Sequence, residues 1–387
     1  MDKKKLATAI DQARSVIKEH PLCSHCLGRM FAVKLGVISH KRLGLKMSKM
    51  LGRKNPTACY ICKTLMTCID DQVRKMISAA EGYEFSTFLI GAILQPSIHD
   101  RDDLIRSRLR LRGIPSIKSD VTRELGKAFS RRTKTVVDYQ SPDITFTIDF
   151  KKDYCEVKPK AILLQGRYTK DVRGIPQKQR PCNECGGKGC FVCDFHGICE
   201  FTSVEGRIAK FLIEKFGAQQ AKINWIGSED ESSLVGGTGR PFFVKLSNPH
   251  RRRAALAKKI KLEGVSLFGM KIIGKIPSEP VRFRTTVVMD IETESEVPAE
   301  MLGMLDMLKG HEVILHENSR THRKTIYEIS ASKKDSRSFT ILMESDGGLP
   351  LKRFVSGREV EPSISSVLGT VCQCNRFDFQ KVAISSR

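Results

Sequence analysis

The chain has 387 residues, 40% of them hydrophobic, which is enough for two or three separately packed domains. Lysine and arginine outnumber aspartate and glutamate by 66 to 43, and the resulting formal net charge of +23 favours polyanions such as nucleic acid. No window approaches the roughly 18 consecutive apolar residues of a membrane span, and residues 1–20 are typical of an amphipathic helix, not of a signal peptide. We therefore expect a cytoplasmic protein with no membrane partner.

Two CxxC turns near the N-terminus predict a metal site. Two residues separate Cys23 from Cys26, and two separate Cys59 from Cys62. Thirteen cysteines in an intracellular chain indicate metal binding more than disulfides, and four thiolates at this spacing suit a tetrahedral zinc ribbon. The alternative is two unrelated pairs of buried cysteines. The basic stretch between the two turns gives this module a means of meeting phosphates as well.

A small α/β region is predicted after the first cysteines. Residues 102–113 and 121–133 have helical spacing and basic faces, whereas residues 143–168 alternate apolar and polar side chains as strands do. We interpret the basic helices as facing RNA. The alternative is a solvated surface.

A second, denser cysteine group follows in RPCNECGGKGCFVCDFHG. Cys182 and Cys185 are separated by two residues, as are Cys190 and Cys193, and a Gly-Gly-Lys-Gly turn joins the two pairs. The glycines allow so short a loop to turn back until all four sulfurs face one ion. We expect a small structural zinc knuckle here, with His196 as an alternative ligand, so that the chain holds one or two zinc ions.

The C-terminal half is predicted to be one α+β domain. Apolar residues at helical spacing run over residues 204–216, and Gly217 is placed to end that helix. Residues 221–226 are typical of a strand that leads directly into Glu229, Asp230 and Glu231. Asp230 therefore follows a strand end, where catalytic residues often lie. Neither a dinucleotide-binding glycine motif nor a P-loop occurs, so we expect no nucleotide cofactor.

Residues 227–242, GSEDESSLVGGTGRPF, resemble the catalytic segment of the tRNA T-loop pseudouridine synthases of archaea and eukaryotes. The pattern of that family is approximately G-R-E-D-x-D-x-R-x-L-G-x-G-R-P-F. The chain is also similar to the archaeal branch in its paired N-terminal CxxC turns, its THUMP-like α/β region, residues 166–177 (GRYTKDVRGIPQ) and residues 347–357 (GGLPLKRFVSG). These stretches occur in the family's order over nearly the whole chain.

The resemblance implies an α+β multidomain fold in four parts. These are an N-terminal zinc-binding module (1–68), a THUMP-like RNA-binding domain (69–176), a cysteine-rich zinc knuckle (177–200) and a pseudouridine synthase catalytic domain with a mixed or antiparallel sheet (201–387). It also implies that the partner is the T-arm of tRNA, that the protein is a monomer, and that catalysis needs no cofactor.

The resemblance also implies roles for individual residues. Members of the family break the bond between uracil and ribose, turn the base and rejoin it through carbon, with one aspartate as the nucleophile. Asp230 matches that aspartate. Arg240 matches the arginine of G-R-P, which holds the catalytic loop or a phosphate, and Lys352 matches a lysine that pairs with the aspartate or with the substrate backbone. For both cations the alternative is a solvated surface position.

Four positions depart from the family pattern. Ser228 stands where the family has an arginine, Ser232 and Leu234 replace an aspartate and an arginine, and Pro350 replaces a tyrosine that contacts uracil. Tyr327 is the candidate replacement ring, with a position in the core as the alternative. Two hypotheses follow, an active tRNA pseudouridine synthase with a divergent pocket and a weakened or inactive RNA-binding homologue that acts as a tRNA chaperone. A zinc-bearing DNA-binding protein would need a recognition helix that the sequence lacks.

Overall fold

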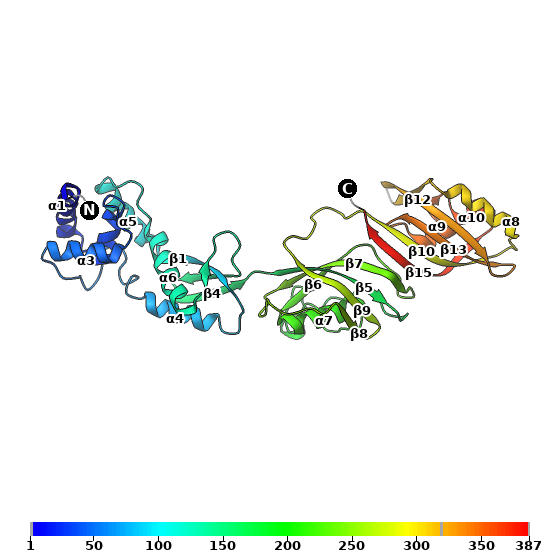
Figure 1. Cartoon of the computed structure of the whole chain (residues 1–387), viewed down its shortest axis with the longest axis horizontal. Coiled ribbons are helices and arrows are strands. Elements are labelled where there is room, and N and C mark those ends of the chain that lie inside the picture. Colours follow the sequence, from blue (N-terminus) through cyan, green and yellow to red (C-terminus); the bar gives the residue numbers. More distant parts are fainter. Residues whose placement is uncertain (1–2, 318–319, 386–387) are drawn as a thin grey trace. The chain divides into compact units, whose positions relative to one another are not determined.

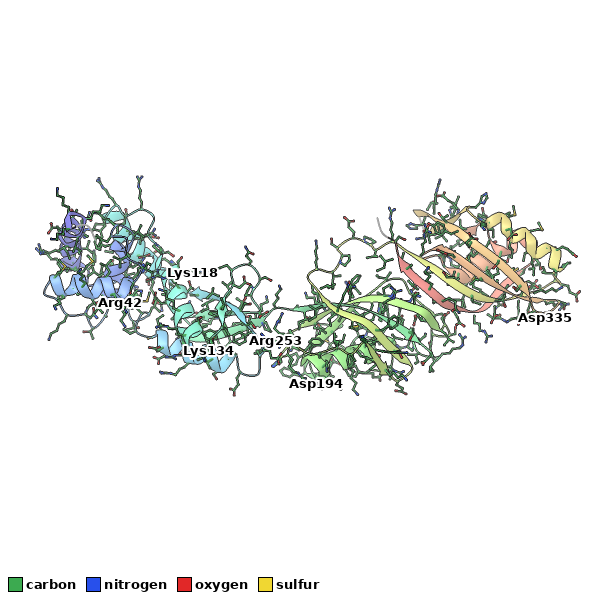
Figure 2. The ribbon with its side chains drawn as sticks, viewed as in Figure 1. Arg42, Lys118, Lys134, Asp194, Arg253 and Asp335 are labelled. Atoms are coloured by element: carbon green, nitrogen blue, oxygen red, sulfur yellow. The ribbon has the colours of Figure 1, made fainter. Side chains whose placement is uncertain are left out.

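The computed structural model describes residues 3–317 and 320–385. Its contacts divide the chain into two units, Met1–Lys160 and Ala161–Arg387, and each unit has a hydrophobic core of its own (Figure 1). Side chains cover both units densely (Figure 2). None of the helices in the described part of the chain combines the length and the apolar character needed to cross a membrane.

The first unit begins with three helices around the first cysteine group, α1 (Lys3–Glu19), α2 (Ser24–Ala32) and α3 (His40–Met50). Helix α1 confirms the expected amphipathic helix, because one face of it is buried. Helices α2 and α3 approach each other closely at two glycines. A Cβ atom on Gly28 would lie 1.8 Å from the carbonyl oxygen of His40, and one on Gly44 would lie 1.6 Å from that of Ser24.

The rest of the first unit is a four-stranded sheet with helices against it. Its elements in chain order are α4 (Ile69–Ala79), β1 (Thr87–Ile93), α5 (Pro96–Arg108), α6 (Ile117–Thr133), β2 (Val136–Val137), β3 (Ile144–Asp149) and β4 (Tyr154–Pro159). The strand order is β2-β1-β3-β4, and only β4 is antiparallel to its neighbour. The rings of Phe88 and Phe146 pack against Phe129 of α6, with centroids 4.8 and 5.0 Å away. The two basic helices are thus confirmed as α5 and α6.

The second unit is built on an 11-stranded sheet of order β14-β11-β12-β13-β10-β15-β7-β5-β9-β8, with β6 paired to β7. Its strands are β5 (Ile162–Lys170), β6 (Gln220–Trp225), β7 (Val235–Ser247), β8 (Lys259–Leu262), β9 (Val265–Ile273), β10 (Phe283–Thr293), β11 (Glu312–Glu317), β12 (Arg320–Lys333), β13 (Ser338–Asp346), β14 (Val360–Glu361) and β15 (Cys372–Ile384). Among the described strands of this sheet, the pairing of β15 with β7 is the parallel one and the others are antiparallel.

Short helices cover this sheet. They are η1 (Phe191–Cys193), α7 (Val204–Phe216), α8 (Ala299–Leu302), η2 (Gly303–Leu308), α9 (Leu351–Ser356) and α10 (Ile364–Leu368). Helix α7 has the expected bounds: the hydroxyl of Ser203 accepts from the amide of Gly206 at its start, and Gly217, with a φ of 58°, ends it. Figure 1 shows α7 beside the strands β5, β6 and β9.

The structure divides the chain before strand β5, whereas the sequence analysis expected a domain boundary after it, at residue 176. Strand β5 pairs with β7 and β9 of the second unit, and the contacts divide the chain between Lys160 and Ala161. The physical reason is that alternating side chains predict a strand without naming its partner. Residues 143–168 are continuous in pattern, yet β3 and β4 belong to one sheet and β5 to another.

Candidate active site

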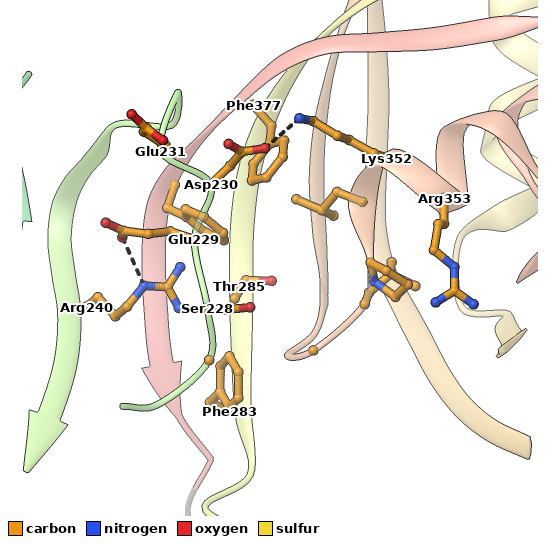
Figure 3. Close-up of a pocket in the computed structure, with 16 residues that line it drawn as sticks. Ser228, Glu229, Asp230, Glu231, Arg240, Phe283, Thr285, Lys352, Arg353 and Phe377 are labelled. Carbon is orange, nitrogen blue, oxygen red and sulfur yellow. Dashed lines mark hydrogen bonds and ion pairs between the residues drawn. The ribbon is translucent and has the colours of Figure 1, made fainter. Parts of the chain in front are cut away.

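The three neighbouring carboxylates lie on the loop between β6 and β7, residues 226–234, here called the acidic loop. It borders a cavity of about 560 Å³ in the second unit. Figure 3 shows that the three side chains point in different directions: Asp230 toward Lys352, Glu229 toward Arg240, and Glu231 away from both. The loop thus separates three charges that adjoin in sequence.

Asp230 pairs with Lys352 of α9. The lysine Nζ donates to Oδ2 of Asp230 at 2.5 Å, and the amide of Ser232 donates to Oδ1 at 3.3 Å. The hydrogen bond from Lys352 lowers the pKa of Asp230 below its ordinary value and outweighs the partial burial that would raise it. The side chains are 31% and 53% exposed, so this is an ionised carboxylate that solvent and ligands reach.

Glu229 points the other way, into the protein. Its side chain is fully buried, and Nε of Arg240 lies 3.4 Å from its Oε2. Arg240, on β7, also donates from Nη1 to the carbonyl of Ile226 at 3.0 Å and stacks over the ring of Phe379 at 4.2 Å. Its guanidinium is buried and engaged with the acidic loop, so its contacts fit the loop-holding role more than a phosphate contact.

Three phenylalanines, Phe283, Phe377 and Phe379, line the cavity together with Asp230 and are here called the aromatic wall. The ring of Phe283 fits between two glycines: a Cβ on Gly227 would lie 2.7 Å from it, and one on Gly347 would lie 2.2 Å from it. Any side chain larger than hydrogen at either glycine would displace the ring. The cavity lining therefore combines apolar rings with carboxylates and cations, and Asp230 and Lys352 are an ion pair within it that solvent reaches, a composition suited to a planar organic ligand.

Two of the departures from the family pattern line this cavity. Ser228 adjoins Asp230 in the acidic loop, and Pro350 precedes the first residue of α9. Neither side chain carries a charge or a flat ring. The cation that pairs with Asp230 is Lys352, and the rings in the lining are those of the aromatic wall.

Tyr327 lies elsewhere, on β12. Its hydroxyl donates to Oδ1 of Asp346 at 3.0 Å, and the guanidinium carbon of Arg284 lies 3.6 Å from the centroid of its ring. Tyr327 is absent from the described side chains that line the cavity. The structure thus places the ring of Tyr327 outside this lining, since a tyrosine's position in a strand pattern does not indicate which pocket its ring faces.

The chain matches two family models, and it matches several curated proteins over most of its length. A family model described as "Pus10 THUMP domain, archaeal" matches residues 73–149, and one described as "Pus10, C-terminal" matches residues 163–266. The chain is 46% identical over 373 residues to the "tRNA pseudouridine synthase Pus10" of Nitrosopumilus maritimus, covering 96% of this chain and 97% of that one. The chain belongs to the Pus10 family.

A second Pus10 relative, from Cenarchaeum symbiosum, is 38% identical and covers 94% of this chain and 90% of its own length. Among solved structures, one chain of a "Cbf5-Nop10-Gar1 Complex" shares 13% identity, with a TM-score of 0.29 and coverage of 45% of this chain and 44% of that chain. That likeness is too slight to add to the Pus10 assignment. The family resemblance stated from the motifs is confirmed.

Both predicted cysteine groups of this Pus10 family member are assembled. The sulfurs of Cys23, Cys26, Cys59 and Cys62 lie within 4.8 Å of one another, as do those of Cys182, Cys185, Cys190 and Cys193. Adjacent sulfurs in the second group are 3.8 to 3.9 Å apart. Four thiolates about 2.3 Å from one zinc ion would be spaced by about 3.8 Å, so the donor sets fit zinc.

Backbone amides support the second group. The amides of Gly189 and Gly197 donate to the sulfurs of Cys185 and Cys193 at 3.2 and 3.3 Å, which favours the thiolate form. His196 instead contacts the carbonyl of Gln219 at 2.8 Å through Nδ1. The four cysteines are therefore a complete ligand set without it.

A buried polar cluster near the first group was not predicted. Asp120 of α6 contacts Nε2 of His25 and Nδ1 of His40, both at 2.8 Å, and Arg123 lies 2.5 Å from the same carboxylate. Burial alone would raise the pKa of Asp120. The contacts with His25 and His40 outweigh it, so the pKa of this carboxyl lies below its ordinary value. The guanidinium beside the carboxylate makes this an ion-pair network that joins α2 and α3 to α6.

Phe283 is one of the residues of the Pus10 pocket, with Phe377 and Phe379, that the sequence analysis did not predict. It opens β10, far from the acidic loop in sequence, and no motif marks it. The available signal was the pair of glycines, Gly227 and Gly347, whose missing side chains leave room for a ring. A glycine indicates that another group packs closely against the backbone, but it does not identify that group.

Proposed function

We propose that the protein converts uridine to pseudouridine in the T-loop of tRNA, with Asp230 as the nucleophile and no cofactor. The observation that carries the proposal is the ionised carboxylate of Asp230, which is paired with Lys352 in a cavity that is also lined by the aromatic wall. Membership of the Pus10 family supports the reaction and the tRNA substrate, since its relatives are named tRNA pseudouridine synthases. The similarity of residues 227–242 to T-loop synthases supports the choice of loop.

The reaction consumes and releases nothing, which is why one carboxylate suffices. The uracil–ribose bond at N1 breaks as Asp230 takes up or stabilises the ribose carbon C1′. The freed base turns in the pocket, and its C5 then bonds to C1′ while the aspartate leaves. The proton on C5 is finally lost and one is gained at N1. The isomerisation thus needs a nucleophile, a held base and a closed pocket.

Lys352 serves this chemistry by keeping Asp230 ionised. Its ammonium lowers the pKa of that carboxyl, so the nucleophile is in its charged form at neutral pH. Because its side chain is 53% exposed, the same ammonium can also reach a phosphate of the RNA backbone.

Phe283 supplies the stacking surface for the flipped uracil in this proposal. Its ring lines the same cavity as Asp230 and is held there between Gly227 and Gly347. Stacking on an aromatic ring is tolerant of the ring's identity, because every base has a π-face. A phenylalanine therefore takes the part that the family gives to a tyrosine.

The alternative function is an RNA-binding tRNA chaperone without chemistry. The observation that favours it is Ser228, which lines the cavity where the family has an arginine. The net charge of +23 serves either function, since it attracts the RNA backbone. In both functions the T-arm of tRNA is the partner, each cysteine group holds one structural zinc, and the protein acts as a cytoplasmic monomer.

A pseudouridine assay on unmodified tRNA transcript separates the two functions. Wild-type protein is compared with Asp230→Ala and Asp230→Asn, and tRNA binding is measured alongside. Product from the wild type and none from either variant, with binding retained, supports the synthase. Tight binding by a wild type that makes no product supports the chaperone.

A further inference from the structure

Lys170 is a charged residue that the second unit buries almost completely. It is the last residue of β5 and is 1% exposed. An ammonium removed from water is costly unless its donors are used. Its partners therefore indicate what the protein gains by burying it.

The partners of Lys170 are three consecutive residues of the acidic loop. Its Nζ lies 3.2 Å from Oε1 of Glu229 and donates to the carbonyls of Asp230 and Glu231 at 3.2 and 3.3 Å. A further bond, of 3.0 Å, goes to the carbonyl of Ile175. An ammonium has three donors, and all three are used on the backbone carbonyls of Ile175, Asp230 and Glu231, while the carboxylate of Glu229 lies beside the ammonium as an ion pair.

The residues after Lys170 extend the same contact along the loop. The guanidinium of Arg173 donates to the carbonyl of Ser232 and to both carboxylate oxygens of Asp378 at 2.7 Å. The amide of Gly174 donates to the carbonyl of Glu231 at 3.1 Å. Residues 170–174, here called the brace, thus bind the acidic loop at every residue from 229 to 232.

Asp378 fixes the brace from a third segment. This residue of β15 also accepts the amide of Leu234 at 2.8 Å. The brace, the acidic loop and β15 are therefore joined at one carboxylate. Arg173 and Lys170 together leave the loop little freedom to move.

We propose that Lys170 and Arg173 are positioning residues that fix the direction of the Asp230 carboxylate. The inference rests on the proposed function and adds two residues to it. Lys170 is absent from the described residues that line the cavity, as is Arg173, so neither touches the substrate there. They act through the backbone of the acidic loop, whereas Lys352 acts on the carboxylate itself.

The size of the effect follows from geometry. Few hydrogen bonds hold the loop from within, such as the amide of Ser233 donating to the carbonyl of Asp230 at 3.1 Å. Without the ammonium, the carbonyls of Asp230 and Glu231 lose a shared donor, and the carboxylate is free to shift. A misplacement of about 1 Å costs on the order of 100-fold in rate.

The test uses the full-length protein with Lys170→Met, and Lys261→Met as the matched control. Lys261 is exposed on β8, at the edge of the sheet and three strands from β7. The single-turnover rate of pseudouridine formation is measured at saturating tRNA transcript, together with the Kd for tRNA and the thermal midpoint. We expect K170M to lose about 100-fold in rate, with an unchanged Kd, and K261M to keep the wild-type rate.

Arg173→Gln is the second variant, because the side chain of Arg173 is 36% exposed and we therefore expect this variant to fold. We expect R173Q to lose about 10-fold in rate, which is a smaller factor than the one expected for K170M. The Kd should again be unchanged. A purely structural role would lower the thermal midpoint and leave the rate of the folded protein unchanged.

The outcomes separate this inference from the proposed function. A wild type without product overturns both. An active wild type with folded K170M or R173Q at the wild-type rate overturns the inference alone. If K170M does not fold, R173Q decides the test. A lower rate of R173Q at an equal Kd then supports the positioning role, and an equal rate overturns it.

Discussion

Glu229 and Asp230 are neighbours in sequence, yet they lie on opposite sides of the acidic loop. The side chain of Glu229 is fully buried between Lys170, Arg240 and Tyr168. We call these four residues the dry side of the loop. Asp230 is 31% exposed and meets a single lysine, on the pocket side. Two carboxylates of equal charge thus have different tasks, because burial commits one to holding the loop and leaves the other available to a substrate.

Tyr168 completes the dry side. Its hydroxyl donates to Oε2 of Glu229 at 2.7 Å and accepts from Nε2 of Gln177 at 3.1 Å. Burial raises the pKa of Tyr168, and the charge of Glu229 raises it further, so the phenol stays protonated and donates. On the dry side the charge of Glu229 is thus held among buried cations and a phenol, whereas on the pocket side the carboxylate of Asp230 stays partly exposed.

The largest expected effect is on stability and comes from the dry side. Glu229→Gln leaves Lys170 and Arg240 buried without their countercharge, so we expect it to lower the free energy of unfolding by about 3–5 kcal/mol. Asp230→Asn, on the pocket side, is expected to cost less than about 1 kcal/mol. Urea unfolding followed by the fluorescence of Trp225, the single tryptophan, reports on this unit. Equal losses would contradict the division into two sides.

The next effect concerns the aromatic wall. Phe283→Ala removes the proposed stacking surface, and we expect it to lose about 1–3 kcal/mol of binding to the flipped base, or roughly 5- to 150-fold in single-turnover rate. Phe283→Tyr keeps the ring and is the matched control, with a rate close to wild type. If Phe283→Ala and Phe283→Tyr are equally active, uracil does not stack on this ring.

A smaller effect is expected from the pocket-side lysine. Lys352 lowers the pKa of Asp230, so Lys352→Met should raise that pKa toward its ordinary value. A carboxylate with a raised pKa is protonated at higher pH, so the acid limb of activity should move to higher pH. The measurement is the single-turnover rate as a function of pH, with Lys261→Met as the control. An acid limb that stays in place would show that Lys352 does not tune Asp230.

The smallest effect on the acidic loop is expected from the first cysteine group. Cys23→Ser with Cys26→Ser should remove one zinc ion per chain and weaken tRNA binding. The single-turnover rate at saturating tRNA should stay at the wild-type value, because both cysteines belong to the other unit. Metal analysis by mass spectrometry counts the zinc. An unchanged zinc content after both substitutions would show that the assignment of this group was wrong.

Sequence motifs predicted the parts of this site that local spacing encodes. Asp230 follows a strand end within a recognisable segment, and the two cysteine groups are set by short CxxC spacings that the structure brings together. Helix α7 was bounded by its own cap and its final glycine. In each case the information lies within a few residues of the feature that it specifies.

Contacts between distant segments were beyond such patterns. Nothing near Lys170 indicates that it is buried under Asp230, because the contact joins residues 60 apart and depends on β5 pairing with β7. Phe283 and Tyr327 show the same limit, since both rings lie in strand patterns and only packing decides which one faces the pocket. Likewise, alternation predicted β5 as a strand but assigned it to the wrong sheet.

By itself, therefore, the sequence determined the family, the nucleophile candidate, the metal-ligand sets and four of the helices, because each depends on residue type at short range. The tertiary structure alone decided which charged side chains are buried and which are exposed to solvent. That choice depends on burial, and burial is a property of the whole sheet and its loops. The same Glu-Asp pair on a solvated loop would have been two ordinary surface carboxylates.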